Sequence, residues 1–289
     1  MRRANSKRVI KRIFVTLLCL VLFALSLLFV NDKANQCVFL TKYSFTHKDI
    51  PESFNGFKIL MISDLHNAPF SDKIVKHIKK QSLDIIAVCG DIVQLPDADF
   101  TEMMKIAEEA RDIPIYAVSG NHERQSSVYE DIFDTLYKDG IIILENDSVE
   151  IKRDSDSILL AGIKDPRHDV VTEEKLKSIN NNIKAELPDD ECFSILLSHR
   201  ADLYYGIKDS GVDLILSGHL HGGIVRLPFV GGLVGKNAEN SFFPCCEYGL
   251  VHEGKDSASM IVSGGCDKNP GKRRFFNPPE VVLITLQGE

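Results

Sequence analysis

Five short apolar runs, rich in β-branched residues, recur along this chain, and each is followed at once by acidic, amide or imidazole side chains. The runs cover 58–62, 85–88, 115–118, 193–197 and 214–216. Runs of this length and composition predict buried strands. In open α/β sheets, ligands bind in the crevice beyond the carboxyl ends of the strands. The pattern therefore predicts an α/β fold that gathers polar side chains from five strand ends in one place.

The order of the remaining patterns predicts how the layers are arranged. Helical periodicity at 71–81, 98–111, 126–138 and 172–180 alternates with the strands. From residue 141 onward the pattern changes, and 141–144, 149–152 and 157–161 read as consecutive strands with turn residues between them. Alternating strands and helices followed by consecutive strands predict a layered αββα sandwich. We expect this domain to span 57–289, after a connector at 31–56 that could include a first edge strand.

The polar strand ends carry nitrogen and oxygen donors suited to holding two metal ions. There are seven of them: Asp64, His66, Asp91, Asn121, His199, His219 and His221. Taken singly, a strand-end Asp is more often a turn or helix-cap residue, and a lone His can simply end a strand. Their joint occurrence favours a binuclear metal site. Donor sets without thiolate favour Mn, Fe or Zn.

The spacing within two pairs of candidate ligands predicts the direction of their side chains. Asp64 and His66 are two residues apart, so on an extended segment their side chains would emerge on one side. The same argument applies to His219 and His221.

The segments in this order, Asp-Leu-His, Gly-Asp, Gly-Asn-His-Glu, Ser-His and Gly-His-Leu-His, resemble the calcineurin-like metallophosphoesterase superfamily from about residue 57 to 286. Within it, the stretches 198–200, 212–223, 226–229 and 278–286 are similar to the membrane-associated bacterial subgroup. Two positions depart from that subgroup. Ile224 stands where Gln is usual, and Gly264 follows Ser263 where Arg is usual. Neither position is a metal ligand in the family, so the departures bear on the substrate rather than on the chemistry.

The resemblance implies a role for each candidate residue. The first metal would be held by Asp64, His66, Asp91 and His221, and the second by Asp91, Asn121, His199 and His219. Asp91 would bridge the ions, because a carboxylate offers two oxygens and a negative charge. Since the match places His219 and His221 on different ions, the backbone between them must turn. The cofactors would be two divalent ions per chain, with Mn preferred and Fe or Zn possible.

The resemblance also implies a catalytic residue and a nucleophile. His122 would protonate the leaving oxygen or stabilise the transition state, which suits imidazole because its pKa lies near neutrality. The nucleophile would be hydroxide formed from metal-activated water. Glu123 either orients the turn around Asn121 and His122 or caps the following helix. Arg226 is a candidate for substrate binding, and the cluster 272–274 either binds phosphate or is solvated surface.

The N-terminus predicts a membrane anchor. Residues 1–12 carry six basic side chains and no acidic one, and 13–30 form an uncharged apolar run of 18 residues. This run is at the lower end of what spans a bilayer and is longer than a signal-peptide core. No Ala-x-Ala site follows it, which favours an uncleaved signal anchor over a cleaved peptide. Basic residues on the short N-terminal side predict a cytoplasmic 1–12 and a catalytic domain outside the cytoplasm.

Charge limits the partners that this chain would bind. Without the six N-terminal cations the formal net charge moves from −7 to −13. An acidic domain gains nothing from general attraction to a polyphosphate, so nucleic acid is not an expected partner. A small or lipid-linked phosphoester drawn by the metal ions is easier to accommodate. The apolar stretch 222–235 could contact acyl chains or the membrane, or pack beneath the sheet rim.

Seven cysteines allow limited inference about the redox state. Cys89 and Cys192 lie in apolar strands and are expected to be buried thiols. Cys37, Cys245, Cys246 and Cys266 could form disulfides outside the cytoplasm, with a pairing that sequence does not assign.

Three functions are consistent with these observations. The first is a membrane-anchored, metal-dependent phosphoesterase that hydrolyses a phosphomonoester, phosphodiester or pyrophosphate in an envelope or lipid-linked substrate. The second is a pyrophosphatase of nucleotide-linked acylated sugars. This function requires nucleotide on the substrate's side of the membrane. The third, from a different class, is a non-catalytic metal-binding scaffold, which the intact ligand set and His122 oppose.

Overall fold

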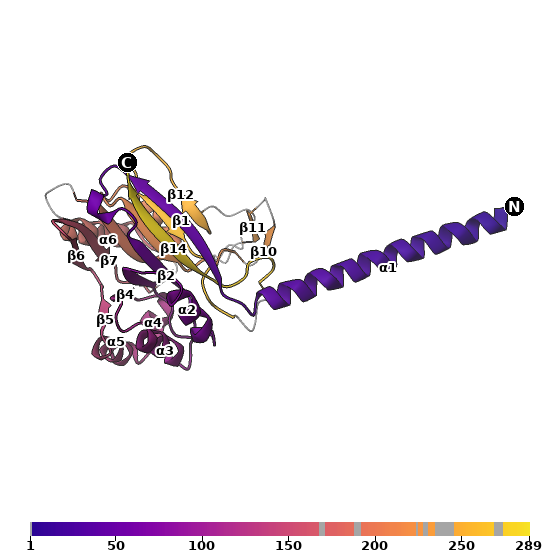
Figure 1. The fold of residues 1–289 in the computed structure, drawn as a ribbon, viewed down its shortest axis with the longest axis horizontal. Helices are drawn as coiled ribbons and strands as arrows, with labels where there is room; N and C mark the ends of the chain where they lie inside the picture. The colour runs from indigo at the N-terminus through magenta and orange to yellow at the C-terminus, as the bar shows by residue number, and fades with distance from the viewer. Residues whose placement is uncertain are drawn as a thin grey trace.

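Two six-stranded sheets and the helices on their outer faces form the main body, from which one long helix projects (Figure 1). The computed structural model describes the chain except residues 1, 168–170, 188–191, 224, 228–230, 235–245 and 269–273.

The first sheet begins with an edge strand that lies N-terminal to the predicted domain boundary. In spatial order its strands are β1 (Phe39–His47), β14 (Glu280–Gly288), β2 (Lys58–Ile62), β3 (Ile85–Cys89), β4 (Ile115–Val118) and β5 (Ile141–Ile143). β1 pairs in parallel with β14, and β14 pairs antiparallel with β2. The strands from β2 to β5 are parallel. The edge strand allowed for within the connector is confirmed as β1.

The second sheet is parallel at its centre and antiparallel at both edges. Its order is β12 (Gly249–Val251), β13 (Ser259–Val262), β9 (Leu214–Gly218), β8 (Ser194–Arg200), β7 (Asp156–Gly162) and β6 (Asp147–Arg153). The strands from β13 to β7 are parallel, while β12 and β6 run antiparallel to their neighbours. In both sheets the central strands are buried along most of their length, which is why their sequences are continuous apolar runs.

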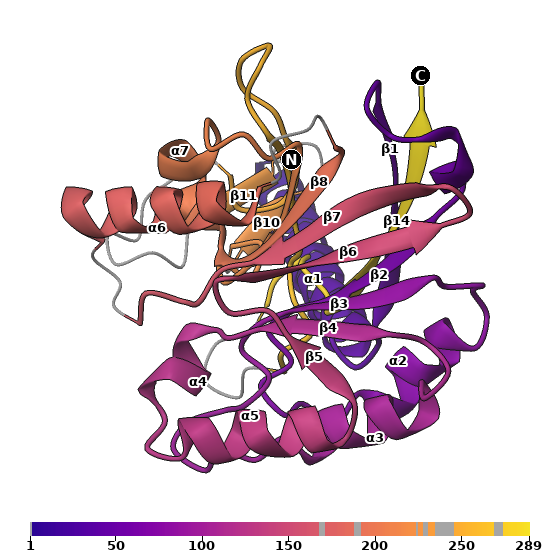
Figure 2. The same cartoon turned by 90° about the vertical axis from the view of Figure 1, so that its left-hand side faces the viewer.

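The main core lies between the two sheets. Ile59 and Met61 of the first sheet share a buried cluster with Ile195 and Leu214 of the second. The outer face of the first sheet is covered by α2 (Ser71–Ile78), α3 (Thr101–Glu109) and α5 (Tyr129–Lys138), and that of the second by α6 (Glu173–Glu186) and α7 (Tyr204–Ile207) (Figure 2). The predicted αββα sandwich is confirmed.

Several boundaries differ from the sequence-based expectation. α2 ends at Ile78 rather than at residue 81, and α6 continues to Glu186 rather than stopping at 180. The short elements η1 (Glu52–Phe54), α4 (Asn121–Gln125) and η2 (Ala201–Leu203) were not predicted. In the apolar stretch 222–235, β10 (Val225–Leu227) and β11 (Gly231–Val234) form an antiparallel pair, so much of this stretch is not a loop.

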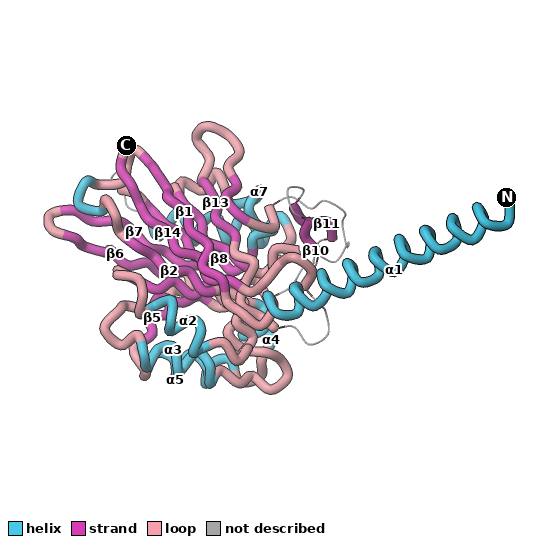
Figure 3. The backbone as a smooth tube through the Cα atoms, turned by 45° about the vertical axis from the view of Figure 1, so that its right-hand side comes forward, coloured by secondary structure: helices cyan, strands magenta, loops and turns pink. Residues whose placement is uncertain are grey.

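The projecting helix is α1 (Arg2–Ala34), which Figure 3 shows extending away from the body. Its part from Ile10 to Ala34 is long and apolar enough to cross a membrane, and the most apolar stretch within it is not buried against the rest of the chain. The helix continues beyond the predicted end of the span at residue 30, and its last turn meets the body. Asn31 is 4% exposed.

Candidate metal centre

All five polar segments meet at the carboxyl ends of adjacent parallel strands. Asp64 and His66 follow β2, Asp91 follows β3, and Asn121 opens α4 after β4. From the second sheet, His199 lies near the end of β8, and His219 and His221 follow β9. The convergence expected from the sequence is therefore present, and the site lies where the edges of the two sheets meet.

The backbone of these segments is unusual. Positive φ angles occur at Asp64 (50°), His66 (45°), Asp91 (52°), His219 (73°) and His221 (51°). This conformation is uncommon for residues other than glycine, and it clusters at functional sites. The turn required between His219 and His221 is thus confirmed. The prediction that Asp64 and His66 lie on an extended segment is wrong. Left-handed backbone, not strand alternation, directs both side chains into the site.

Asp91 lies at the centre of the cluster. Its buried Oδ2 is 3.4 Å from His199 Nε2, 3.6 Å from His66 Nε2 and 4.0 Å from His122 Nε2. No hydrogen-bond partner for this oxygen is found among the described residues. A buried carboxylate oxygen without a hydrogen bond is costly. A cation between this oxygen and the surrounding imidazoles would remove that cost, so the donors fit a metal ion.

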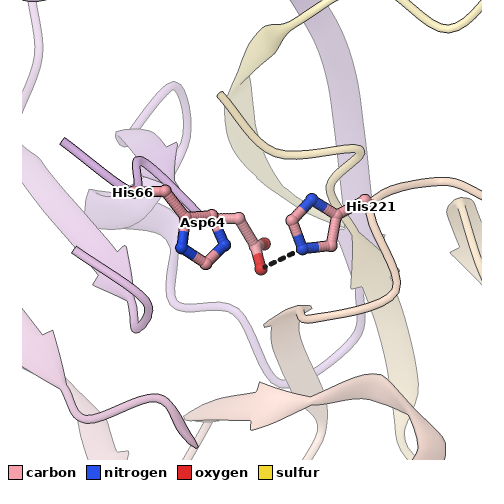
Figure 4. A group of neighbouring side chains, drawn as sticks. All are labelled: Asp64, His66 and His221. Atoms are coloured by element: carbon pink, nitrogen blue, oxygen red, sulfur yellow. Dashed lines mark ion pairs between the residues drawn. The ribbon is translucent and has the colours of Figure 1, made fainter. Parts of the chain in front are cut away.

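One group of donors lies on the Asp64 side of Asp91. Donor atoms of Asp64, His66 and His221 all lie within 4.8 Å of one another. Asp64 Oδ1 is 3.3 Å from His221 Nε2, the pair joined in Figure 4. The rings of His66 and His221 are stacked, with centroids 5.2 Å apart. Burial lowers the pKa of His66 to about 4, although Asp91 acts in the opposite direction. The neutral imidazole that results is the form that binds metal.

A second group lies on the other side of Asp91. His199 Nε2 is 3.1 Å from His219 Nδ1 and 3.2 Å from Asn121 Oδ1. The other ring nitrogen of His199 is 2.8 Å from the carbonyl oxygen of Cys89, which fixes the ring. Burial opposes a charge on His199, but Asp91, Asp64 and Asp165 outweigh it and raise the pKa to about 10. The site therefore holds an excess of negative potential that a cation would neutralise.

Glu123 holds two of the site loops together. Its buried carboxylate accepts hydrogen bonds from the backbone N–H groups of Asp91 (2.9 Å), Val93 (2.9 Å) and Gly120 (2.7 Å). Burial and the neighbouring Asp91 raise the pKa of Glu123 to about 7. The bond from Gly120 caps α4, the helix to which Glu123 itself belongs, rather than the helix that follows it.

A buried ion pair that sequence reasoning missed lies behind the second group. Arg200 is 1% exposed; its Nε is 2.9 Å from Asp165 Oδ2, and its Nη1 is 3.3 Å from His219 Nε2. The available signal was a charged residue directly after His199 in an otherwise apolar strand.

The two basic candidates have different surroundings. Arg226 Nη1 donates to the carbonyl of Gly222 at 3.0 Å, and its guanidinium lies 3.9 Å from the ring centroid of Tyr248. Arg274 is buried and lies 3.1 Å from Asp267, so it is not solvated surface. Lys272 and Arg273 lie outside the described residues.

The cysteines that the structure describes give no disulfide evidence. Cys37 is exposed and Cys266 is buried, and both are free thiols, as are Cys89 and Cys192. Cys89 is buried as expected, but Cys192 is only partly buried. Cys245 lies outside the described residues.

Comparison with known proteins adds independent information. A family model described as calcineurin-like phosphoesterase matches residues 57–223. A metallophosphoesterase of Aquifex aeolicus is 30% identical over 261 residues, which cover 86% of this chain and 91% of that protein. A transmembrane protein with metallophosphoesterase domain from Danio rerio is 27% identical over 72% of this chain and 50% of its own length. The phosphodiesterase YaeI of Escherichia coli is 31% identical over 61% of this chain and 64% of its own.

Proposed function

Because the chain belongs to the calcineurin-like phosphoesterase family, we propose that it is a membrane-anchored enzyme that hydrolyses phosphoesters with two divalent ions. The observation that carries the proposal is the buried Asp91 Oδ2, which faces imidazoles from three separate segments and has no hydrogen-bond partner among the described residues. A carboxylate in that position can serve two cations at once.

The donors divide between two ions as the geometry groups them. Asp64, His66 and His221 would hold one ion. His199, His219 and Asn121 would hold the other, with Asp91 shared between the two. When bound, such ions polarise the phosphoryl oxygens and lower the pKa of water to near 7. Mn²⁺ is our preferred metal, with Fe or Zn as the alternatives that the donors allow.

His122 is suited to proton donation. Its Nδ1 accepts the backbone N–H of Leu95 at 3.4 Å, which leaves the proton of a neutral ring on Nε2. Nε2 points toward the centre of the site, 4.0 Å from Asp91 Oδ2. The side chain is 21% exposed, whereas that of His199 is fully buried. His122 is therefore accessible to a substrate, and we assign it the protonation of the leaving oxygen.

The position of α1 supports a substrate at a membrane surface. Asn31 and Asn35, at the end of this helix, each donate a hydrogen bond of 2.8 Å to the carbonyl of Arg274. The Arg274 side chain lies against Asp267, which contacts His221. Phe39 and Phe276 are 46% and 41% exposed near the end of the helix. A lipid-linked or envelope phosphoester is the substrate class that this arrangement favours.

Among phosphoesters we place diesters first, since the Escherichia coli relative is called a phosphodiesterase. The basic N-terminus favours a catalytic domain outside the cytoplasm. Nucleic acid is not an expected partner, because the domain is acidic.

The test compares the full-length chain in detergent with its His122→Ala variant, using an aryl phosphodiester and an aryl phosphomonoester with Mn²⁺. We expect kcat to fall roughly 10²- to 10⁴-fold in the variant while bound metal is retained. His252→Ala is the matched control, because His252 is exposed and lies in the segment after β12, outside the site. Hydrolysis by His122→Ala at the wild-type rate would contradict the role assigned to His122.

A further inference from the structure

A carboxylate lies behind His221, on the side away from the other donors. His221 Nδ1 is 3.1 Å from Asp267 Oδ1, whereas its Nε2 faces Asp64 Oδ1 at 3.3 Å. His221 is 6% exposed and Asp267 is 3% exposed. The ring is thus held between two buried carboxylates, and only the Nε2 side belongs to the group with Asp64 and His66.

This contact has a chemical consequence for metal binding. A carboxylate 3.1 Å from Nδ1 favours the tautomer that carries its proton on Nδ1, which leaves the lone pair of Nε2 for a metal. Carboxylate partners of this kind fix the tautomer and ring orientation of a metal-binding histidine and increase its basicity. Asp267 lies 46 positions after His221 in sequence, and no motif of the chain includes it.

Arg274 completes the environment of Asp267. Its Nη2 lies 3.1 Å from the same Asp267 oxygen. The guanidinium also donates to the carbonyl groups of Gly265 (3.1 Å), His221 (3.3 Å) and Gly264. A buried carboxylate requires such compensation, because an unpaired charge in the interior is strongly unfavourable. Arg274 therefore keeps Asp267 in place and also binds the backbone of His221.

The end of α1 is fixed to the same segment. The carbonyl of Arg274 accepts hydrogen bonds from Asn31 Nδ2 and Asn35 Nδ2, both at 2.8 Å. Asn31 Oδ1 in turn accepts the backbone N–H of Phe276 at 2.8 Å. Two side chains, one helical turn apart, thus clamp the backbone on both sides of Phe275.

We propose that Asp267 is a positioning residue for His221, and that Arg274 connects this pair to the end of α1, so that docking of the membrane helix stabilises the first metal position. This inference rests on the proposed function, because it treats His221 as a ligand. It adds a residue outside the metal-binding motifs and gives the helix a role besides anchoring. A purely structural ion pair would change the stability of the fold but not the metal affinity of molecules that remain folded.

The first arm of the test measures Mn²⁺ binding by calorimetry, using the full-length chain in detergent after removal of metal with a chelator. We expect Asp267→Ala to weaken one of the two Mn²⁺ sites by roughly 10- to 100-fold and leave the other unchanged. Asp267→Asn, which keeps the shape and an acceptor oxygen, should have a smaller effect on the same site. Circular dichroism shows which variants are folded. If Asp267→Ala does not fold, the Mn²⁺ affinity of Asp267→Asn tests the proposal instead.

Asp84→Asn is the matched control for this arm, because the Asp84 carboxylate also lies beside an arginine, 3.6 Å from Arg153 Nη1, but away from the site. Wild-type Mn²⁺ affinity in both Asp267 variants would overturn the positioning role. If the wild type bound none of Mn²⁺, Fe²⁺ and Zn²⁺, the proposed function would fail instead, so the two failures are distinguishable.

The second arm tests the connection to the helix with the double variant Asn31→Ala/Asn35→Ala. We expect the same Mn²⁺ site to weaken several-fold, because Arg274 loses the contacts that hold its backbone. Asp32→Ala is the control, since Asp32 is exposed on the same turn of α1. Unchanged Mn²⁺ affinity in the folded double variant would overturn the role of the helix.

Discussion

At the level of single residues, two glycines allow the loops of the proposed metal site to lie close to one another. A Cβ on Gly120 would overlap Asp91 Oδ1, and a Cβ on Gly218 would overlap Ser63 Oγ. Neither glycine has a positive φ, so close approach rather than backbone conformation is what requires glycine there. The glycines of the Gly-Asn-His-Glu and Gly-His-Leu-His segments are thus explained by packing between loops.

Gly120→Ala tests this explanation. The added methyl group would displace Asp91, the proposed shared donor, and we expect Mn²⁺ affinity to fall at least about tenfold. Gly140→Ala is the control. Nothing lies within 4 Å of its new Cβ, so its φ of 89° should reduce stability by about 1 kcal/mol without changing metal binding. Wild-type affinity in Gly120→Ala, measured by titration calorimetry, would show that the contact is not required.

Glu123→Gln should destabilise the metal-free fold. The carboxylate accepts three backbone N–H groups, and an amide NH₂ cannot accept any of them. Leaving one buried N–H unsatisfied costs about 1–3 kcal/mol, which chemical denaturation of the metal-free protein would measure. Glu109→Gln should leave stability nearly unchanged, because Glu109 is exposed and its ion pair with Lys79 lies at the surface. Equal stability of the two variants would contradict the structural role of Glu123.

The sequence predicted the metal-binding candidates better than the residues that support them. The seven donors follow strand ends, so a strand pattern alone brings them together. Asp267 and Arg274 contact His221 only through tertiary packing, and no periodicity marks them. The positive φ of Asp64 and His66 was also not predictable, because neither residue type requires that conformation.

Packing decides where the elements end. The sequence-based end of α6 at residue 180 reflects a run of asparagines, which are poor helix formers. Ile179 and Ile183 are nevertheless buried against the second sheet, four residues apart on one face, and their burial extends the helix to Glu186. The predicted strands agree with the structure more closely than the predicted helices do, because a strand buried on both faces is marked by a continuous apolar run.

A pH-dependent contact joins α2 to α3. The carboxylate of Glu102 accepts the backbone N–H of Ser71 at 3.0 Å and lies 2.7 Å from Lys105 Nζ. Burial opposes its ionisation, but Lys105 and Ser71 outweigh burial and lower the pKa of Glu102. The charged form is therefore favoured in the folded state.

Glu102→Gln should consequently lose stability in a pH-dependent manner. A lowered folded-state pKa contributes stability above the unfolded value, about 4.3, and this contribution is lost as pH falls through the folded pKa. We expect the variant to be about 1 kcal/mol less stable than the wild type near pH 7, with the difference shrinking below about pH 4. Chemical denaturation of the wild type and the variant near pH 7 and below about pH 4 measures this difference in stability. A difference that does not depend on pH would contradict the assignment.

For the whole molecule, one apolar helix and an acidic αββα body indicate an enzyme held at a membrane surface. The last turn of α1 binds the segment that supports His221, so the site lies close to the point where the helix leaves the body. The basic N-terminus favours the proposed orientation, in which the body lies outside the cytoplasm.

Cys37 offers a direct test of this orientation. It is an exposed free thiol three residues after the end of α1. In intact cells a membrane-impermeant maleimide should label the wild type, and Cys37→Ser should lose most of that label. Labelling that requires lysis of the cells would place the body in the cytoplasm.

The number of Mn²⁺ ions bound per chain, measured together with phosphodiester hydrolysis, tests the central claim most directly. For the reconstituted full-length protein we expect about two ions and hydrolysis that a chelator abolishes. Asp91→Asn should lose both bound metal and activity, because Asp91 is the donor that we propose the two positions share. Absence of bound Mn, Fe or Zn after reconstitution, or normal metal content in Asp91→Asn, would contradict the account.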